Sequence, residues 1–278
     1  MRTSWGLSGY PDRPMVQRSF LGTATTLAFA HRGGAGDAPE NTLPAFEAAV
    51  ALGYRYLETD VQLTRDGVLL AFHDDRLDRL TDRAGTIPEL TYAEVREADA
   101  GYAFSPDGGQ SFPFRGRGVV IPTLEDLLTR WDDVYLNIDA KTDETVAPLV
   151  ELIRRLDAFG RVCIGSFSDR RVARIRALAC GRICSSMGQV ATGTAFLVSR
   201  SGRMPGFHAD CLQVPQRWGI LRIDRRFVKA AHRAGLPVHV WTIDDEADMD
   251  YLLDLGVDGI MTDRPRLLKE VFQRRGLW

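Results

Sequence analysis

The alternation of short apolar segments with longer amphipathic segments constrains the fold of this chain more than any other feature. From about residue 26 onward, runs rich in Val, Ile, Leu and Phe alternate with stretches whose apolar residues recur at helical spacing. This alternation is typical of a parallel sheet built from βα units. The length of 278 residues suits an α/β barrel, which takes about 250 residues. We therefore predict a single TIM (β/α)8-type barrel over residues 26–278, preceded by an N-terminal extension over residues 1–25.

Nine segments have the pattern of strands, although a barrel of this type needs only about eight. They are residues 26–30, 54–63, 67–72, 134–141, 161–167, 181–187, 210–215, 237–243 and 258–262. One of them must lie outside the barrel or not be a strand, and 181–187 and 210–215 carry the weakest signals. Amphipathic helices are predicted over 42–53, 91–101, 123–131, 143–160, 168–180, 224–235 and 245–256.

Two connections depart from the βα pattern. The sequence TRDG, residues 64–67, is a turn signal and is too short for a parallel crossover, so we expect a hairpin or irregular crossing between the second and third strands. Residues 101–118 are rich in Gly, Phe and Arg and indicate a long loop. Long loops in compact domains are often functional, and this one is equally able to close over a substrate or to pack on the barrel rim.

Composition and charge exclude several classes of protein. Hydrophobic residues make up 45% and charged residues 26% of the chain, which excludes disordered and fibrous proteins. The 35 basic and 37 acidic residues are scattered and give a net charge of −2, so nucleic acid is not an expected partner. No apolar run reaches the roughly 18 residues of a transmembrane segment. Pro11, Asp12 and Pro14 interrupt any signal-peptide core, which favours a cytoplasmic protein.

The four cysteines, Cys163, Cys180, Cys184 and Cys211, form neither a CxxC motif nor a dense disulfide framework. We expect reduced, partly buried thiols.

Paired polar residues lie on two of the predicted strands. Residues two apart on a strand share a face, so Glu58 and Asp60 project together, as do Asp139 and Lys141. In an antiparallel sheet this alternation would simply mark a solvated face. In a parallel sheet both faces are covered, and buried carboxylates must be paired, hydrogen-bonded or bound to a metal. Three carboxylates suit a hard divalent cation, Mg²⁺ or Ca²⁺, and the positive charges of Lys141 and Arg32 suit an anionic substrate such as a phosphate.

Two histidines end predicted strands. His31 follows residues 26–30 and His73 follows residues 67–72, and barrel active sites form at the carboxyl ends of strands. Imidazole titrates near neutral pH, so the pair can serve as one acid and one base across a scissile bond. The other histidines, His208, His232 and His239, are assigned no chemistry; His239 lies inside an apolar strand pattern, where packing is the expected role.

The sequence resembles the glycerophosphodiester phosphodiesterases. The resemblance is carried by AHRGG, PENTLPAF, YLETDVQLTRDGVLLAFHDDRLDRLTD, IPTLEDLL, NIDAK, GSF, VWTIDD and DGIMTDRP, in this order, over nearly all of the chain from Ala28 onward. It implies a TIM-barrel phosphodiesterase that uses one divalent cation to cleave a glycerophosphodiester into sn-glycerol 3-phosphate and an alcohol. It also implies roles for nine residues: catalysis by His31 and His73, metal binding by Glu58, Asp60 and Asp139, phosphate binding by Arg32 and Lys141, support by Glu40, and a pocket wall for the alcohol at Trp241.

One position departs from the family, which commonly carries Glu where this chain has Asp139. Aspartate is one methylene shorter, so the cation can shift or take a water in the gap, and Mn²⁺ joins Mg²⁺ and Ca²⁺ as a candidate. Three alternative activities share the predicted site. They are a lysophospholipase-D-like enzyme with an apolar groove for an acyl chain, a phospholipase-C-like enzyme that releases a cyclic phosphate, and a non-catalytic phosphate-binding barrel.

Overall fold

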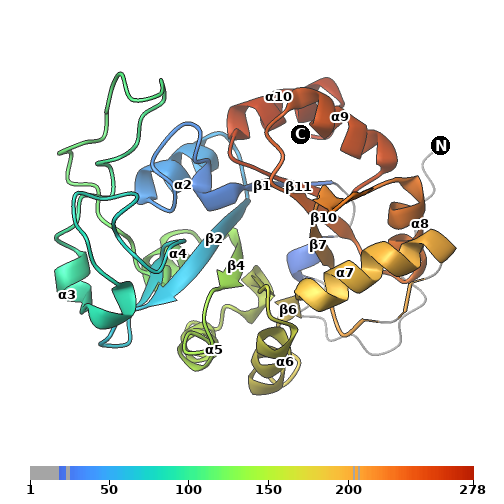
Figure 1. Cartoon of the computed structure of the whole chain (residues 1–278), viewed down its shortest axis with the longest axis horizontal. Coiled ribbons are helices and arrows are strands. Elements are labelled where there is room, and N and C mark those ends of the chain that lie inside the picture. The colour runs from blue at the N-terminus through green and yellow to red at the C-terminus, as the bar shows by residue number, and fades with distance from the viewer. Residues whose placement is uncertain (1–18, 23–25, 203, 206) are drawn as a thin grey trace.

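The protein folds into a curled parallel sheet surrounded by helices, as Figure 1 shows. The structure, a computed structural model, describes residues 19–22, 26–202, 204–205 and 207–278. Eight parallel strands follow the order β6-β5-β4-β2-β1-β11-β10-β7, and the backbone N–H of Asp210 donates to the carbonyl of Ser185 (2.8 Å) where the two ends of this order meet. The strands are β1 (Leu27–Ala30), β2 (Tyr56–Leu63), β4 (Tyr135–Ala140), β5 (Val162–Gly165), β6 (Cys184–Ser185), β7 (Leu212–Pro215), β10 (Val238–Trp241) and β11 (Gly259–Thr262). The predicted TIM-type α/β fold is confirmed.

The additional strand is β3 (Leu69–Ala71), which pairs antiparallel with β2 after a turn over residues 64–67. The predicted hairpin is therefore confirmed, and Gly67 provides the positive φ of 85° that the turn requires. Residues 181–187 and 210–215 carried the weakest strand signals, but the doubt about them was wrong, because they contain β6 and β7 of the barrel. Their strand signal is weak because Ser186 and Gln213 line a cavity and so break the apolar pattern.

Helices cover the outer face of the sheet (Figure 1). They are α2 (Leu43–Ala51), α4 (Leu124–Arg130), α5 (Val146–Arg155), α6 (Asp169–Leu178), α7 (Gln189–Val198), α8 (Arg225–Arg233), α9 (Glu246–Leu255) and α10 (Pro265–Arg274). Side chains of Thr123, Ser168, Asp224 and Asp245 cap four of them. The sequence patterns did not predict α7 and α10, and in neither helix does the side chain of the N-cap residue cap the first turn. In the described residues, no helix has the length and apolar character needed to cross a membrane.

The polypeptide between β3 and α4 forms a small lobe with its own apolar cluster. It contains η2 (Ile87–Glu89) and α3 (Tyr92–Val95), a single turn where residues 91–101 were predicted to be helical. The predicted loop over 101–118 packs against itself: the rings of Phe104 and Phe114 meet edge to face at 5.4 Å, and the Arg115 guanidinium lies 3.6 Å from the centroid of Phe112. None of these residues lines the main cavity of the barrel.

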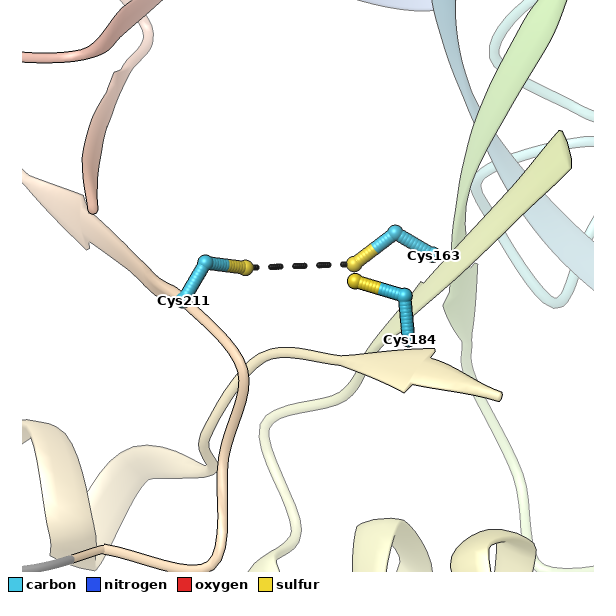
Figure 2. A group of neighbouring side chains, drawn as sticks. All are labelled: Cys163, Cys184 and Cys211. Carbon is cyan, nitrogen blue, oxygen red and sulfur yellow. Dashed lines mark hydrogen bonds between the residues drawn. The ribbon is translucent and has the colours of Figure 1, made fainter. Parts of the chain in front are cut away.

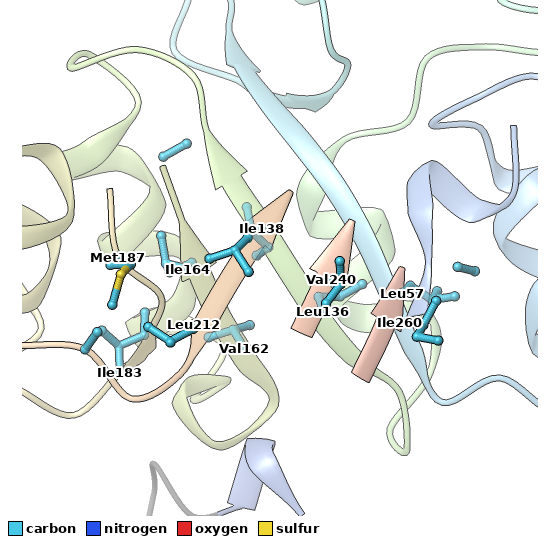
Figure 3. Close-up of a cluster of buried hydrophobic side chains, with 14 of the residues drawn as sticks. Leu57, Leu136, Ile138, Val162, Ile164, Ile183, Met187, Leu212, Val240 and Ile260 are labelled. Carbon is cyan, nitrogen blue, oxygen red and sulfur yellow. The ribbon is translucent and has the colours of Figure 1, made fainter. Parts of the chain in front are cut away.

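Alternation along the strands separates an outer core from the barrel interior. Figure 3 shows part of the outer core, which the helices share and which includes Leu57, Leu136, Ile138, Ile164 and Val240. A second cluster includes Phe20, Phe29, Cys163, Cys184, Cys211 and Met261. Phe20 is fully buried, and its carbonyl accepts a hydrogen bond from the Tyr56 hydroxyl (2.8 Å). A residue of the predicted N-terminal extension therefore contributes to the core of the barrel.

Candidate active site

A cavity of about 230 Å³ opens at the carboxyl ends of the barrel strands. Parallel strands bring the residues that follow them to the same edge, so segments far apart in the sequence meet there. The cavity is lined by eight of the nine predicted residues, namely His31, Arg32, Glu58, Asp60, His73, Asp139, Lys141 and Trp241. Glu40 lies behind Arg32, beside a second, smaller cavity.

His31 is held by a carboxylate from the opposite end of the chain. It starts η1 (His31–Gly33) directly after β1, and its Nδ1 lies 2.7 Å from Oδ1 of Asp263, which follows β11. Its Nε2 lies 3.7 Å from Oε2 of Glu58. Burial by itself would lower the pKa of His31, but the charges of Glu58 and Asp263 outweigh it and raise the pKa to about 9.

His73 has an equivalent partner. Its Nδ1 lies 2.6 Å from Oδ1 of Asp74, and the Gln62 amide donates to its backbone carbonyl (3.0 Å). Arg79 Nε donates to the other oxygen of Asp74 (2.6 Å). Hydrogen bonds from Arg79, and then from His73, lower the pKa of Asp74 to about 2. Each histidine thus has a carboxylate on Nδ1, which leaves Nε2 for the cavity.

Glu40 connects Arg32, which follows His31, to Arg79, which holds the Asp74 partner of His73. It accepts a hydrogen bond from Arg32 Nη1 (2.9 Å) and two from Arg79 (2.9 and 3.1 Å), and Arg79 also holds Asp74. Glu40 therefore contacts Arg32 and Arg79, and the supporting role predicted for it stays a prediction. The fixed position of Glu40 orients Arg32, whose Nε lies 3.0 Å from Asp60.

The glycines after Arg32 allow a close approach of backbone segments. Arg32 itself has a φ of 51°, and Gly33 has a φ of 82°. A Cβ at Gly33 would lie 2.8 Å from the backbone nitrogen of Phe46 in α2, and a Cβ at Gly34 would lie 2.6 Å from Cγ of Pro265 in α10. The HRGG sequence thus lets the loop after β1 pass between two helices while Arg32 faces the carboxylates.

The predicted acidic residues come from two neighbouring strands. Asp60 of β2 pairs in register with Asp139 of β4, and Lys141 Nζ lies 2.7 Å from a carboxylate oxygen of each. Burial tends to raise the pKa of Asp60, but Lys141 and Arg32 lower it overall. Burial and then the negative charge of Asp60 raise the pKa of Glu58 to about 7. Glu58 is thus the acidic residue with the least compensation from positive charge.

The donor set of Glu58, Asp60 and Asp139 fits a divalent cation. Carboxylate oxygens are the ligands that Mg²⁺ and Ca²⁺ prefer. Burial and the negative charge of Asp60 raise the pKa of Glu58, and a cation beside these carboxylates would offset both effects. In the structure the Lys141 ammonium bridges Asp60 and Asp139. In the described part of the chain, three cysteines form a group whose ligand atoms all lie within 4.8 Å of one another, and the three carboxylates do not form such a group.

The other side of the cavity is apolar. Trp241, at the end of β10, lines it together with Phe167, Met187, Pro215 and Trp218. The rings of Phe167 and Trp241 meet edge to face at 5.8 Å, and Phe167 is 54% exposed. The cavity therefore has a charged half and an aromatic half.

Sequence reasoning missed several residues of the site. Asp263 and Asp74 stand in the quoted TDRP and HDD sequences, but only contacts across the barrel reveal that they hold the histidines. Asn41 of PENT donates to Asp60 (3.2 Å). No local pattern marks Arg79. Of the unassigned histidines, His232 pairs with Asp258 (2.7 Å), and His239 is buried within the barrel.

Comparison with known proteins places this fold and site in one class. The model of the glycerophosphoryl diester phosphodiesterase family matches residues 31–267. A probable glycerophosphodiester phosphodiesterase 2 of Mycobacterium tuberculosis is 42% identical over 93% of this chain and 95% of its own length. A glycerophosphodiester phosphodiesterase of Caldanaerobacter subterraneus is 30% identical over 90% of this chain and 99% of its own length.

Solved structures agree with the sequence matches. A glycerophosphodiester phosphodiesterase from Agrobacterium tumefaciens is 28% identical with a TM-score of 0.70, covering 88% of this chain and 99% of that one. A phosphodiesterase from Oleispira antarctica, solved with the product sn-glycerol-3-phosphate, is 25% identical with a TM-score of 0.72, covering 90% and 97%. The fold is that of the TIM-barrel glycerophosphodiester phosphodiesterases. The chain belongs to the glycerophosphoryl diester phosphodiesterase family.

Proposed function

We propose that this protein hydrolyses glycerophosphodiesters to sn-glycerol 3-phosphate and an alcohol, with His31 and His73 transferring protons. The observation that carries this proposal is that two carboxylate-held histidines face one cavity that also contains Arg32 and Lys141. The family match, and the glycerol phosphate in the Oleispira antarctica structure, support the choice of substrate.

The charged half of the cavity would bind the phosphodiester. Arg32 is fixed by Glu40 and Asp60, so it can present its guanidinium to phosphate oxygens at little entropic cost. Lys141 can turn from the carboxylates toward the same oxygens. Fixed positive groups stabilise the charge that develops on these oxygens in the transition state.

The cation site proposed for the same half consists of Glu58, Asp60 and Asp139, with Mg²⁺ or Ca²⁺ as the preferred ion and Mn²⁺ as a third candidate. A bound divalent cation would supply Lewis-acid polarisation of the phosphate. The carboxylates of the chain would hold it between β2 and β4, the strands on which they are in register.

Proton transfer is assigned to the two histidines. One Nε2 would accept the proton of the attacking group, which is water or the glycerol 2-hydroxyl, and the other would protonate the leaving oxygen. Attack by the 2-hydroxyl would first form a cyclic phosphate, and water would then open it to sn-glycerol 3-phosphate with the two proton-transfer roles exchanged. Asp263 and Asp74 would keep each ring oriented and stabilise its protonated form.

A second candidate activity is hydrolysis of lysophospholipids. The observation that favours it is the aromatic half of the cavity, where Phe167 is 54% exposed at the end of β5 beside Trp241. The groove that an acyl chain needs would come from these residues and not from the loop over 101–118. Faster turnover of lysophosphatidylcholine than of glycerophosphocholine would select this activity.

The decisive experiment measures glycerol 3-phosphate release from a panel of glycerophosphodiesters, with chelator and then with added Mg²⁺, Ca²⁺ or Mn²⁺. The proposal predicts metal-dependent release that His31→Ala and His73→Ala each reduce by about 10²-fold or more. His208→Ala, which changes an exposed histidine outside the cavity, is the matched control. Full activity of either variant would contradict the histidine pair. Release of a cyclic phosphate as the final product would indicate phospholipase-C-like chemistry, and binding without turnover would indicate a binding protein.

A further inference from the structure

Three cysteines meet inside the barrel in a group unrelated to the charged site (Figure 2). Cys163 of β5, Cys184 of β6 and Cys211, directly before β7, are buried, and their Sγ atoms all lie within 4.8 Å of one another. The Sγ atoms of Cys163 and Cys211 are 3.9 Å apart, far beyond the roughly 2.05 Å of a disulfide bond. The sequence predicted reduced, partly buried thiols, but it did not indicate that three of them converge.

A buried histidine, His239, also lies inside the barrel near Cys211. His239 of β10 is 1% exposed, and its Nδ1 has no hydrogen-bond partner among the described residues. Burial raises the pKa values of the Cys163 and Cys184 thiols, whereas hydrogen bonds from these two residues and, to a smaller extent, from His239 lower the pKa of the Cys211 thiol. A Cβ at Gly259 would lie 2.8 Å from Cδ2 of His239, so this glycine of β11 makes room for the ring inside the barrel.

The barrel geometry explains why these four residues face the same interior. Cys163 and Cys184 are register partners on neighbouring strands, and each of the four residues precedes a cavity-lining residue by two positions. The cavity-lining residues are Gly165, Ser186, Gln213 and Trp241. Because side chains two apart share a face, the three cysteines and His239 point into the barrel beneath these cavity-lining residues. The Gln213 amide, which lines the cavity, lies 3.9 Å from the Cys163 sulfur.

We propose that Cys163, Cys184, Cys211 and His239 form a tetrahedral site for Zn²⁺ or a similar thiophilic cation. Three thiolates and one imidazole are an established ligand set for structural zinc. With Zn–S bonds of about 2.3 Å, the sulfur–sulfur edge of a tetrahedral site is about 3.8 Å, and the Cys163–Cys211 separation is 3.9 Å. Binding releases the three thiol protons, so affinity for the ion rises with pH. Soft sulfur ligands distinguish this site from the carboxylates above it, which suit Mg²⁺ or Ca²⁺.

The test is titration of the reduced full-length protein with Co²⁺, because sulfur-to-cobalt charge-transfer bands report thiolate ligation and intense d–d bands report tetrahedral geometry. We expect one equivalent of thiolate-bound Co²⁺ per chain, its displacement by Zn²⁺, and one zinc retained after dialysis. Cys211→Ala should abolish the charge-transfer band. His239→Gln should weaken Zn²⁺ binding by more than about 10-fold, since loss of even an outer-shell partner typically costs that much. Cys180→Ser changes the exposed cysteine and is the matched control, which should bind like the wild type.

The wild-type measurement decides the proposal even where a variant fails to fold. Absence of the charge-transfer band in reduced protein, with four titratable thiols after denaturation and no zinc after dialysis, would overturn it. A band that persists in folded Cys211→Ala would overturn the ligand assignment. Zn²⁺ should also raise the Tm of the wild type and of Cys180→Ser, but not that of Cys211→Ala.

Discussion

Nδ1 of His31 lies 2.7 Å from Oδ1 of Asp263, although 232 positions separate the two residues in the sequence. The contact exists because β1 and β11 are parallel neighbours, with Ala30 opposite Thr262, so both strands end at the same edge. A carboxylate on Nδ1 fixes the ring and leaves Nε2 directed at the cavity.

Asp263→Asn should reduce kcat by about 10²-fold to 10⁴-fold, the range that general acid–base catalysis contributes. An amide cannot stabilise the protonated ring as the carboxylate does, and it can hold the wrong tautomer. Steady-state kinetics with glycerophosphocholine measure this change. Asp133→Asn, which removes an exposed partner of Arg55, should leave kcat unchanged, and equal activity of the two variants would contradict the role of Asp263.

Arg79→Ala should lower kcat/KM by about 10-fold to 100-fold without unfolding the protein, because Arg79 positions both Glu40 and Asp74. The matched control is Arg76→Ala, since Arg76 pairs with Asp78 on an exposed surface three residues earlier. Kinetics and circular dichroism of both variants separate misplacement of the site from loss of fold. Wild-type kinetics in Arg79→Ala would show that Arg32 and His73 keep their positions without it.

Removal of divalent cations should abolish activity, and Mg²⁺, Ca²⁺ or Mn²⁺ should restore it if the carboxylates bind the ion. Asp139→Asn should raise the cation concentration needed for half-maximal activity, because one negative ligand is lost. Asp139→Glu keeps the charge and should retain activity, whereas Asp132→Asn at an exposed position should behave like the wild type. Full activity after exhaustive chelation would exclude the cation from the mechanism.

Asp74 should contribute to acid stability. Its pKa is about 2 in the folded protein and about 3.9 in an unfolded chain. Because the folded value is the lower one, its stabilising contribution is complete above about pH 4 and is lost as the pH falls toward 2. Asp74→Asn should therefore unfold with a weaker pH dependence in this window and lose about 1 kcal/mol at neutral pH, given its partial exposure. Urea unfolding at several pH values measures both effects, and parallel pH profiles of variant and wild type would contradict the assignment.

Phe20→Ala should destabilise the barrel by about 3–5 kcal/mol, the usual cost of removing a buried aromatic ring. Phe20 is fully buried against Phe29, Tyr56 and Tyr135, with ring centroids 6.5, 5.4 and 5.9 Å away. Denaturant unfolding measures the loss, and Leu178→Ala, at a 40% exposed leucine, is the control. A change below about 1 kcal/mol would show that Phe20 is dispensable for the fold.

The sequence by itself determined the α/β architecture and most of the site. Period-two and period-3.6 patterns depend only on local geometry, so the strands, most of the helices and the shared face of Glu58 and Asp60 could be predicted. The turn at residues 64–67 was equally local, because no helix fits between the strands it joins. These patterns also placed His31, Arg32, His73 and Lys141 at strand ends, where the barrel brings them together.

Only the tertiary structure decided which partners each of these residues has. Asp263 reaches His31, Glu40 bridges Arg32 and Arg79, and three cysteines converge beneath the cavity. The weak patterns of residues 181–187 and 210–215 misled the strand assignment because their polar side chains point into the barrel. Local sequence carries no information on which strands become neighbours, since strand order and register are fixed by the closing of the whole sheet.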